Sequence, residues 1–279
     1  MADEANGGGT GIGSHMAAMT GGVAIVTGGG TGIGSAVVRR LAARGVRSVV
    51  NYASSRDDAE ALVAEIGNGS IAVQADIVDD AACRALAQAA TDAFGRIDFL
   101  VNNAGRTTFA AHEDLDALAA DDFVDIYRLN TIAPFQMIRA CADSLRASPM
   151  GAVVNVASVA GLHGIGSSVA YAASKGALIT MTKSLARVLA PRIRINAVAP
   201  GYVGTGWFEK RLGDDGFARL NDRIAKAVPM GFATGPDDIA GPIEMLLDPA
   251  SRVITGEVWQ LDAGSHLDIG MSRRPGREE

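Results

Sequence analysis

The sequence is poor in cysteine and aromatic residues, and neither sign of charge dominates it. Its 279 residues include 2 cysteines and 5% aromatic residues, and the net charge is −6. Cys83 and Cys141 are far apart in the sequence and match no metal or redox motif, so we expect reduced core residues of a cytoplasmic protein. A mildly acidic chain also argues against nucleic acid or an anionic membrane as the main partner.

Long hydrophobic runs are absent as well. No apolar run approaches the roughly 20 residues that a membrane-spanning helix needs, and the first residues, MADE, do not resemble a secretion signal. We therefore expect no membrane partner. A chain of 279 residues, 48% of them hydrophobic, suits one large α/β domain. Such a domain buries roughly three quarters of the surface of its unfolded chain.

The two ends of the chain differ in composition from the rest. The N-terminal segment is polar and rich in glycine, and Gly-Ser-His-Met at residues 13–16 is typical of a tag remnant. Residues 7–13 spell GGGTGIG but have no strand or helix pattern beside them, so we expect no phosphate site there. The expected organisation is a disordered segment, one folded domain and a charged tail, at residues 1–20, 21–270 and 271–279.

The stretch at residues 23–38, VAIVTGGGTGIGSAVV, organises the folded part. It predicts a buried strand at 23–26, a glycine-rich turn, and a helix over 35–43. Glycines in such a turn permit positive φ and let a phosphate approach the backbone N–H groups at the positive end of the helix. A flexible glycine linker is the alternative, but strand and helix patterns flank this loop on both sides.

The spacing of these glycines excludes two common phosphate motifs. The strict G-x-G-x-x-G pattern fails whether it begins at Gly28 or at Gly30. A Walker loop fails because Ser35-Ala36 stands where that motif has Lys-Ser/Thr. The pattern T-G-x-x-x-G-x-G does fit and begins at Thr27. We therefore predict nucleotide contacts at Thr27, Gly28, Gly30, Thr31, Gly32, Ile33 and Gly34.

Apolar runs alternate with amphipathic segments along the rest of the chain. Strands are expected at 23–26, 47–51, 71–75, 97–101, 152–157, 193–198 and 258–261. Helices are expected at 35–43, 57–66, 81–94, 121–146, 169–189 and 237–247. Such alternation predicts an α/β protein with a doubly wound, seven-stranded parallel sheet and ligands at the carboxyl ends of its strands. Pro134 suggests a kink in the fourth helix, and residues 207–232 suit an irregular, mobile lid.

The end of the second strand bears on the choice of cofactor. NAD-binding folds usually place an acid there for the ribose 2′-hydroxyl, but none occurs before Asp57. Small hydroxyl groups and Arg56 could accept a 2′-phosphate instead, which favours NADP over NAD. A helix N-cap at Ser54 or Ser55 describes the same residues equally well. The candidate contacts are Asn51, Tyr52, Ala53, Ser54, Ser55 and Arg56.

A Tyr-x-x-x-Lys pair supplies candidate acid–base chemistry. Tyr171 and Lys175 stand at i and i+4, so one helical face presents both. The neighbouring ammonium should lower the pKa of the phenol toward the working range. Ser158 ends the preceding strand and can donate a hydrogen bond to a substrate oxygen. Alone, the pair is more often a chance surface pair, so its value comes from its place after Ser158 and the glycine turn.

Together these motifs resemble the short-chain dehydrogenase/reductase family, close to the 3-oxoacyl-carrier-protein reductase type. From about Gly22 to Leu267 they follow in that family's order: TGGGTGIG, Asp76, NNAG at 102–105, Asn130, Ser158, YAASK at 171–175, Pro200-Gly201 and TGEVWQLDAG at 255–264. The resemblance implies a single Rossmann-type domain with helices on both faces of the sheet. It also implies a homotetramer or at least a dimer.

The resemblance also implies a role for each matching residue. Tyr171 would exchange a proton with the carbonyl or alcohol oxygen, and Ser158 would orient that oxygen. Lys175 would hold the nicotinamide ribose, and Asn130 would bind a water linking Lys175 to solvent. Asn102 would brace the central strand. Tyr171 and Lys175 would also touch the cofactor, alongside Asp76, Ile77, Asn103, Ala104, Gly105, Pro200, Gly201, Val203 and Thr205.

The sequence thus predicts an oxidoreductase that moves a hydride between NADP(H) and a small-molecule carbonyl or secondary alcohol, with NAD(H) as the alternative cofactor. A nucleotide-binding regulatory protein on the same fold is the alternative function, and an isomerase or dehydratase is a third. The histidines at 112, 163 and 266 have no ligand spacing, so no metal is expected. His163 could line the substrate pocket, although a loop histidine is the simpler interpretation.

Overall fold

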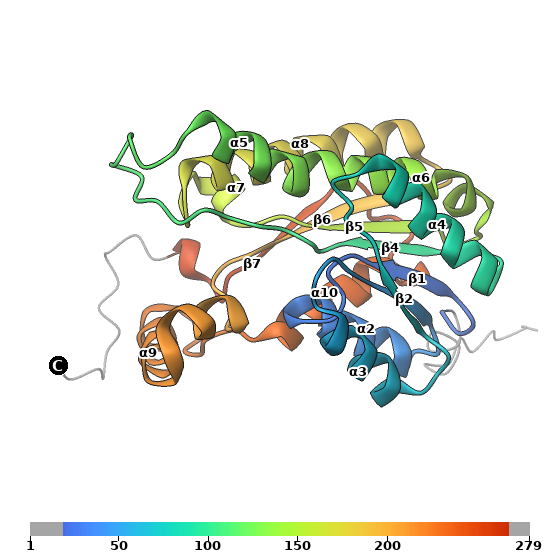
Figure 1. The fold of residues 1–279 in the computed structure, drawn as a ribbon, viewed down its shortest axis with the longest axis horizontal. Coiled ribbons are helices and arrows are strands. Elements are labelled where there is room, and N and C mark those ends of the chain that lie inside the picture. Colours follow the sequence, from blue (N-terminus) through green and yellow to red (C-terminus); the bar gives the residue numbers. More distant parts are fainter. Residues whose placement is uncertain (1–18, 268–279) are drawn as a thin grey trace, which may run out of the picture.

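Seven strands form one parallel sheet in the computed structural model, which describes residues 19–267 (Figure 1). The strand order is β3-β2-β1-β4-β5-β6-β7, and every neighbouring pair is parallel. The strands are β1 Val23–Val26, β2 Arg47–Tyr52, β3 Ile71–Gln74, β4 Phe99–Asn102, β5 Ala152–Val156, β6 Arg194–Pro200 and β7 Val258–Leu261. The predicted doubly wound sheet is confirmed.

Helices cover both faces of this sheet (Figure 1). On one face lie α2 Gly32–Ala43, α3 Arg56–Ile66 and α10 Pro236–Leu247. On the other lie α4 Asp80–Phe94, α5 Ala120–Tyr127, α6 Ala133–Ala147 and α8 Val169–Leu189. The short helix α7 Ala160–His163 was not predicted from the sequence. The long helix α9 Gly206–Ala227 lies apart from the other helices (Figure 1). The expected tag remnant, second GGGTGIG copy and charged tail lie outside the described residues.

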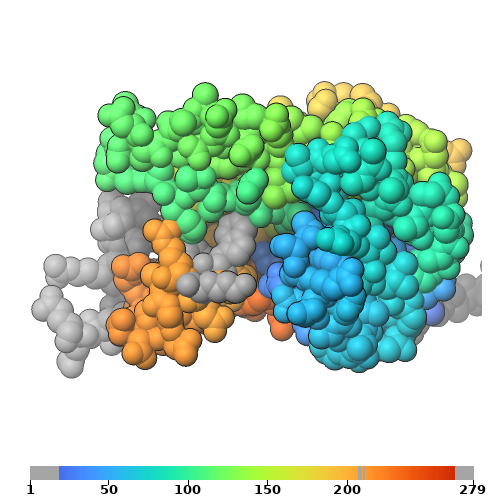
Figure 2. All heavy atoms as spheres, viewed as in Figure 1, coloured from blue at the N-terminus to red at the C-terminus, as the bar shows by residue number. Residues whose placement is uncertain are grey.

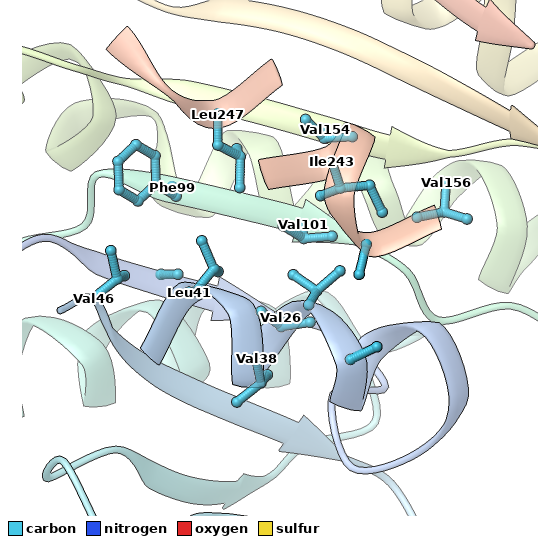
Figure 3. Packing of buried hydrophobic residues seen from close by; sticks show 14 of the residues in the cluster. Val26, Val38, Leu41, Val46, Phe99, Val101, Val154, Val156, Ile243 and Leu247 are labelled. Carbon is cyan, nitrogen blue, oxygen red and sulfur yellow. The ribbon is translucent and has the colours of Figure 1, made fainter. Parts of the chain in front are cut away.

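Parallel strands are buried on both faces, which explains why the predicted strands are continuous apolar runs. All four residues of β1 and all five of β5 are buried. One core packs α2 and α10 onto the sheet, and Figure 3 shows Leu41, Phe99, Ile243 and Leu247 meeting there. A second core lies under α4, α6 and α8. It includes Cys83 and Cys141, which are free and fully buried as predicted.

The helix expected over 121–146 is interrupted, but not at Pro134. A π-helical turn, Arg128–Ile132, separates α5 from α6. Pro134 lies in the first turn of α6, where a backbone N–H would have no hydrogen-bond partner within α6. The turn centres on Asn130, whose fully buried side chain is held by partners on two other segments. The predicted kink at Pro134 was therefore wrong, because a tertiary contact rather than proline sets the irregularity.

The segment expected to be an irregular lid is largely helical. α9 runs from Gly206 to Ala227, with one non-helical residue at Gly213 (φ 66°, ψ 170°). The two glycines at 213 and 216 obscured the helical pattern in the sequence. Tertiary contacts support the helix: the Tyr202 hydroxyl donates to Asn221 Oδ1 at 2.7 Å. Across residues 19–267, no helix is long and apolar enough to cross a membrane.

Candidate active site

The order of the strands creates a crevice at one edge of the sheet. From β1 the chain first extends the sheet through β2 and β3, and then returns to the other side of β1 with β4. At such a reversal the flanking connections diverge, and ligands bind outside the carboxyl ends of the strands. Thr27 follows β1, Ser158 follows β5, and Pro200 ends β6. The predicted residues therefore converge on this edge from separate parts of the chain.

The glycine turn after β1 is fastened to the end of β4. Thr27 Oγ1 accepts from the backbone N–H groups of Asn103 at 3.0 Å and Ala104 at 3.1 Å. Asn103 Nδ2 donates in return to the carbonyl oxygens of Thr27 and Gly28, both at 3.0 Å. The roles of Thr27 and Asn103 in this structure are thus to fix the turn.

The beginning of α2 is shaped for an anion. A Cβ atom on Gly34 would lie 2.3 Å from the Gly28 carbonyl oxygen, so only glycine permits this tight turn. Gly32 has φ +53°, a conformation that favours glycine. Thr31 is the N-cap residue but makes no side-chain cap bond, and the first turn of α2 holds no acid. By contrast, α3 and α10 each carry two acids there. The positive end of α2 is therefore free for a phosphate.

The residues at and after the end of β2 divide into two groups. Asn51 is buried and its Nδ2 donates to the Ala75 carbonyl oxygen at 3.0 Å, while Tyr52 is buried in the core. Ala53 and Ser54 are exposed. Ser55 occupies the N-cap position of α3, as the alternative expected, but its side chain makes no cap hydrogen bond.

Arg56 extends from the first residue of α3, with 62% of its side chain exposed. Its Nε lies 3.8 Å from Glu60 Oε1, a distance typical of a weak surface pair. The side chains of Asn51 and Tyr52 thus turn inward, whereas those of Ser54 and Arg56 face solvent at the place where an adenine ribose is expected.

The residues after β3 are placed differently from one another. Asp76 is exposed, and its Oδ1 accepts from the Val78 N–H at 3.1 Å. Ile77 is buried, and its carbonyl oxygen accepts from Gln136 Nε2 at 3.1 Å. Asp76 therefore presents a carboxylate at the rim of the crevice, whereas the Ile77 side chain is buried and its carbonyl oxygen is hydrogen-bonded to Gln136.

The start of α8 positions the tyrosine and the lysine. Ser168 is the N-cap residue, and its Oγ accepts from the Tyr171 N–H at 3.2 Å. One turn later, Lys175 Nζ donates to the Val156 carbonyl oxygen at 2.8 Å and lies 5.7 Å from the centre of the Tyr171 ring. Ser158 lies beside Tyr171, and its Oγ accepts from the Ala160 N–H at 3.1 Å. The structure thus brings the three predicted residues together.

Burial governs the acidities of this group. Removal from water raises the pKa of Tyr171 above its usual value, and the hydrogen bond from Ser158 opposes that rise. Burial likewise lowers the pKa of Lys175 to about 8. The expectation that Lys175 brings the pKa of Tyr171 down was wrong for this arrangement, because burial raises that pKa and only Ser158 opposes the rise. Tyr171 is consequently a protonated phenol at neutral pH and can donate its proton.

The side chain of Asn130 connects separate segments of the chain beside Tyr171 and Lys175. Its Nδ2 donates to the Arg106 carbonyl oxygen at 2.9 Å and to Ser174 Oγ at 3.0 Å. Its Oδ1 accepts from the Arg106 N–H at 2.9 Å. Both amide hydrogens are thus used by the protein. A Cβ on Gly105 would lie 3.2 Å from Asn130 Oδ1 and 3.5 Å from Lys175 Nζ, so that glycine lies against both.

The far wall of the crevice comes from the segment after β6. Gly201 packs so closely on Asp262 that its own Cβ would lie 2.8 Å from that of Asp262. Val203 is buried, and Thr205 is the N-cap residue of α9 without a side-chain cap bond. A Cβ on Gly32 would lie 3.5 Å from Thr205 Cγ2. The start of α9 therefore faces the glycine turn directly across the crevice.

Asn155, Thr182 and Ser168 support the site but were missed in the sequence, whereas Asn102 was expected to brace the central strand. Asn102 Nδ2 donates to Asn155 Oδ1 at 2.8 Å, and Asn155 Nδ2 donates to Thr182 Oγ1 at 2.9 Å, which ties β4, β5 and α8 together. The signal was an asparagine inside an apolar strand. Ser168 was also detectable, because a serine directly before a helix is a common N-cap.

The histidines do not form a metal site in the described part of the chain, where no group of three or more metal-ligating side chains occurs. His266 Nδ1 lies 2.9 Å from Asp262 Oδ2. Burial opposes ionisation of Asp262, yet hydrogen bonds from Gln260, His266 and Ser265 lower its pKa to about 2. His163 Nε2 lies 3.1 Å from Gln260 Nε2, so it stands at the end of this cluster on the crevice wall.

Comparisons with known proteins agree with this geometry. Residues 28–266 match a protein family described as enoyl-(acyl carrier protein) reductase. The chain is 37% identical over 255 residues to a 3-oxoacyl-[acyl-carrier-protein] reductase of Synechocystis, with 89% of this chain and 98% of the relative covered. It is 33% identical over 248 residues to the 3-oxoacyl-[acyl-carrier-protein] reductase FabG of Staphylococcus aureus, with 88% and 98% covered.

Solved structures show the same likeness. A short-chain dehydrogenase/reductase (glucose/ribitol dehydrogenase) of Brucella melitensis superposes with a TM-score of 0.80 at 27% identity, with 88% of this chain and 97% of that chain covered. A dehydrogenase/reductase of Sinorhizobium meliloti gives the same TM-score at 31% identity, with 91% and 99% covered. The chain therefore belongs to the short-chain dehydrogenase/reductase family and is an NAD(P)-dependent oxidoreductase similar to the 3-oxoacyl-carrier-protein reductases.

Proposed function

We propose that this protein reduces a carbonyl to a secondary alcohol with NADPH, in the cytoplasm, where its two buried cysteines remain thiols. The observation that carries the proposal is that Tyr171, whose pKa is raised, lies beside Ser158 with Lys175 one turn away on α8. A phenol whose pKa is raised is a proton donor at neutral pH, which suits the direction of carbonyl reduction.

In this proposal each residue has one task at the carbonyl oxygen. Ser158 donates a hydrogen bond that orients the oxygen, and Tyr171 Oη donates the proton that completes the alcohol. When bound, the nicotinamide would supply the hydride to the carbonyl carbon. Lys175 would hold the nicotinamide ribose, and its hydrogen bond to the Val156 carbonyl oxygen limits the positions that its ammonium group can take. Asn130 supports Lys175 through Gly105 and α8, and its water-binding role stays a prediction.

The cofactor fits the residues on both sides of the crevice. The free first turn of α2, with Thr31, Gly32, Ile33 and Gly34, would hold the pyrophosphate. Val203 and Thr205 would meet the nicotinamide amide, and the exposed Asp76 would contact the adenine. The backbone at Gly28, Gly30, Ala104, Gly105, Pro200 and Gly201 would line the remainder of this site.

The test of the reaction replaces the proton donor. Tyr171→Phe should lose at least roughly a hundredfold in turnover, the usual scale of acid–base catalysis, while it still binds NADPH. Tyr127→Phe is the matched control, because within residues 19–267 the Tyr127 hydroxyl donates only to the Ala173 carbonyl oxygen. Turnover would be followed by NADPH consumption with 3-oxoacyl thioesters. Near-normal turnover of the Tyr171 variant would refute the proposed role.

Two alternatives are separated by the same assay. The family description names an enoyl reductase, which reduces a carbon–carbon double bond, so a 2-enoyl thioester should be tested beside the 3-oxoacyl thioester. A nucleotide-binding regulatory protein would bind cofactor without reducing either. The two neighbouring hydroxyl groups of Ser158 and Tyr171 can both donate to a carbonyl oxygen, which favours carbonyl reduction.

The preference for NADPH rests on Ser54, Ser55 and Arg56. A carboxylate at this place would repel a 2′-phosphate that carries nearly two negative charges, and none is present at 51–56. A charge-assisted bond from Arg56 is worth about 1.5–3 kcal/mol, or about ten- to a hundredfold in affinity. Arg56→Ala should weaken NADPH more than NADH in fluorescence titrations. Arg84→Ala is the control, because Arg84 forms a similar exposed pair with Asp80. Equal or tighter binding of NADH by the unaltered protein would reject the preference.

We also propose that the protein assembles as a homotetramer, or at least a dimer. The outer surfaces of α5, α6 and α8 and the turn between them leave large apolar side chains exposed, namely Phe123, Val124, Ile132, Phe135, Val169 and Val188. Covering such a surface with a second copy removes it from water. Light scattering at micromolar concentration should show a species well above 28.7 kDa. A purely monomeric protein would contradict the proposal.

A further inference from the structure

A cavity at the outer end of the crevice contains more positive charge than the proposed reaction uses. It measures about 470 Å³ and lies between α9 and the segment that follows β4. Figure 2 shows the orange atoms of α9 reaching those of the green segment above them. The lining side chains are Phe109, Arg211, Leu212, Arg219, Leu220 and Arg223, together with Gly216.

The three arginines of this cavity form no ion pair with an acidic residue that the structure describes. In the described part of the chain no carboxylate lies within 4.0 Å of Arg211, Arg219 or Arg223, and Arg211 instead stacks over the Phe109 ring at 4.0 Å. By contrast, Arg44 and Arg96 are paired with acids at 2.6 Å. Three guanidinium groups around one cavity repel one another, so an oxyanion placed among them would be bound by charge-assisted hydrogen bonds.

The same cavity also has an apolar part. The side chains of Phe109 and Leu212 are 42% and 43% exposed, and Leu220 lines the cavity beside them. An apolar chain lying on these residues would remove both its own surface and theirs from water. The lining therefore suits a molecule that is apolar along its length and anionic at one end.

Both walls of the cavity are tied to the candidate active site. The Ala110 N–H donates to the Ser167 carbonyl oxygen at 2.9 Å, so Phe109 is held beside the residue that precedes the N-cap of α8. On the other side, α9 is preceded by its N-cap residue Thr205, which faces the glycine turn. A substrate whose carbonyl reaches Tyr171 can thus extend outward between the two walls toward the arginines.

We propose that this cavity is an oxyanion subsite that selects carbonyl substrates with a phosphate or carboxylate at the end remote from the carbonyl. The proposal rests on the carbonyl reduction proposed above. Arg219 and Arg223 lie one turn apart on α9, and Arg211 closes the cavity from the other side of Gly213. Phe109 and the two leucines bind the apolar chain, and Phe109 also positions Arg211.

The test compares matched anionic and neutral ketones on the Arg219→Gln/Arg223→Gln protein. The pairs are 5-oxohexanoate with its methyl ester, and 5-oxohexyl phosphate with 6-hydroxyhexan-2-one. For the anionic member of each pair the variant should raise KM by roughly tenfold or more and leave kcat unchanged, whereas kcat/KM for the neutral member should stay within about twofold. The carboxylate and phosphate arms show which oxyanion the site prefers. Equal losses for charged and neutral ketones, or no loss at all, would overturn the proposal.

The control and a second measurement keep this result independent of the reaction. Lys226→Gln removes one positive charge from the same helix outside the cavity lining. This control should change the KM of the anionic ketones and the KM of the neutral ketones by no more than about twofold. Calorimetric titration with hexyl phosphate and with hexanoate, which have no carbonyl, should show binding that the double variant loses. If no ketone is reduced yet this binding depends on the arginines, the subsite stands and the proposed reaction fails. If ketones are reduced and neither anion binds, the subsite is wrong.

Discussion

Lys175 is a charged group whose burial should cost the protein stability. It is 3% exposed, and burial lowers its pKa from 10.5 to about 8. At about 1.4 kcal/mol per pH unit, keeping this ammonium ionised at pH 7 costs the folded state about 3 kcal/mol. Lys175→Met removes that cost, but also the hydrogen bond to the Val156 carbonyl oxygen, worth about 1 kcal/mol. The variant should therefore be more stable than the parent by about 2 kcal/mol and should lose its activity.

The pH dependence of this difference tests its origin. Because the folded pKa of Lys175 lies below the unfolded value, the unfolded chain binds more protons between pH 8 and pH 10.5. Below pH 8 the parent protein is therefore destabilised by the full cost of burying the ammonium, and its free energy of unfolding increases as the pH rises through this window. The methionine variant has no such group, so its advantage should shrink toward zero near pH 10.

Urea unfolding at fixed protein concentration would measure both effects, at pH 7 and pH 9.5. Lys183→Met is the matched control, because Lys183 lies on the same helix but is exposed. Its stability should differ little from that of the parent at either pH. A Lys175→Met protein that is less stable than the parent at pH 7, or an advantage independent of pH, would refute the reasoning.

Two further predictions concern the scaffold of the site. Gly34→Ala should destabilise the protein by about 1–3 kcal/mol and abolish NADPH binding in a fluorescence titration, because the new Cβ would lie 2.3 Å from the Gly28 carbonyl oxygen. Retained binding would show that the turn can shift. Asn130→Ala should cost about 2–4 kcal/mol in urea unfolding, because it leaves the Arg106 N–H and carbonyl without their buried partner. A loss below about 1 kcal/mol would show that water replaces the amide.

The elements whose signals are local were predictable from the sequence. The expected strand at 23–26 and helix at 169–189 are reproduced to the residue as β1 and α8, and β7 likewise. Buried parallel strands are apolar runs with sharp ends, and the ends of α8 are marked by Ser168 and by a proline at 191. Because Tyr171 and Lys175 are four positions apart, they lie on the same face of their helix however that helix packs. These features depend on residues a few positions apart, so the sequence alone contains them.

Other features depend on partners that are distant in the sequence, and only the tertiary structure decided them. The turn at Asn130 is π-helical because its amide bonds Arg106 and Ser174, 24 and 44 residues away. The pKa of Tyr171 is raised rather than lowered because packing excludes water from it. Asn51 turns inward because its amide donates to the Ala75 carbonyl oxygen, and Tyr52 turns inward because it packs in the hydrophobic core. The arginines of α9 line a cavity only because Phe109, about 100 positions earlier, forms its other wall. Burial and long-range contacts set these properties, and no local pattern encodes either of them.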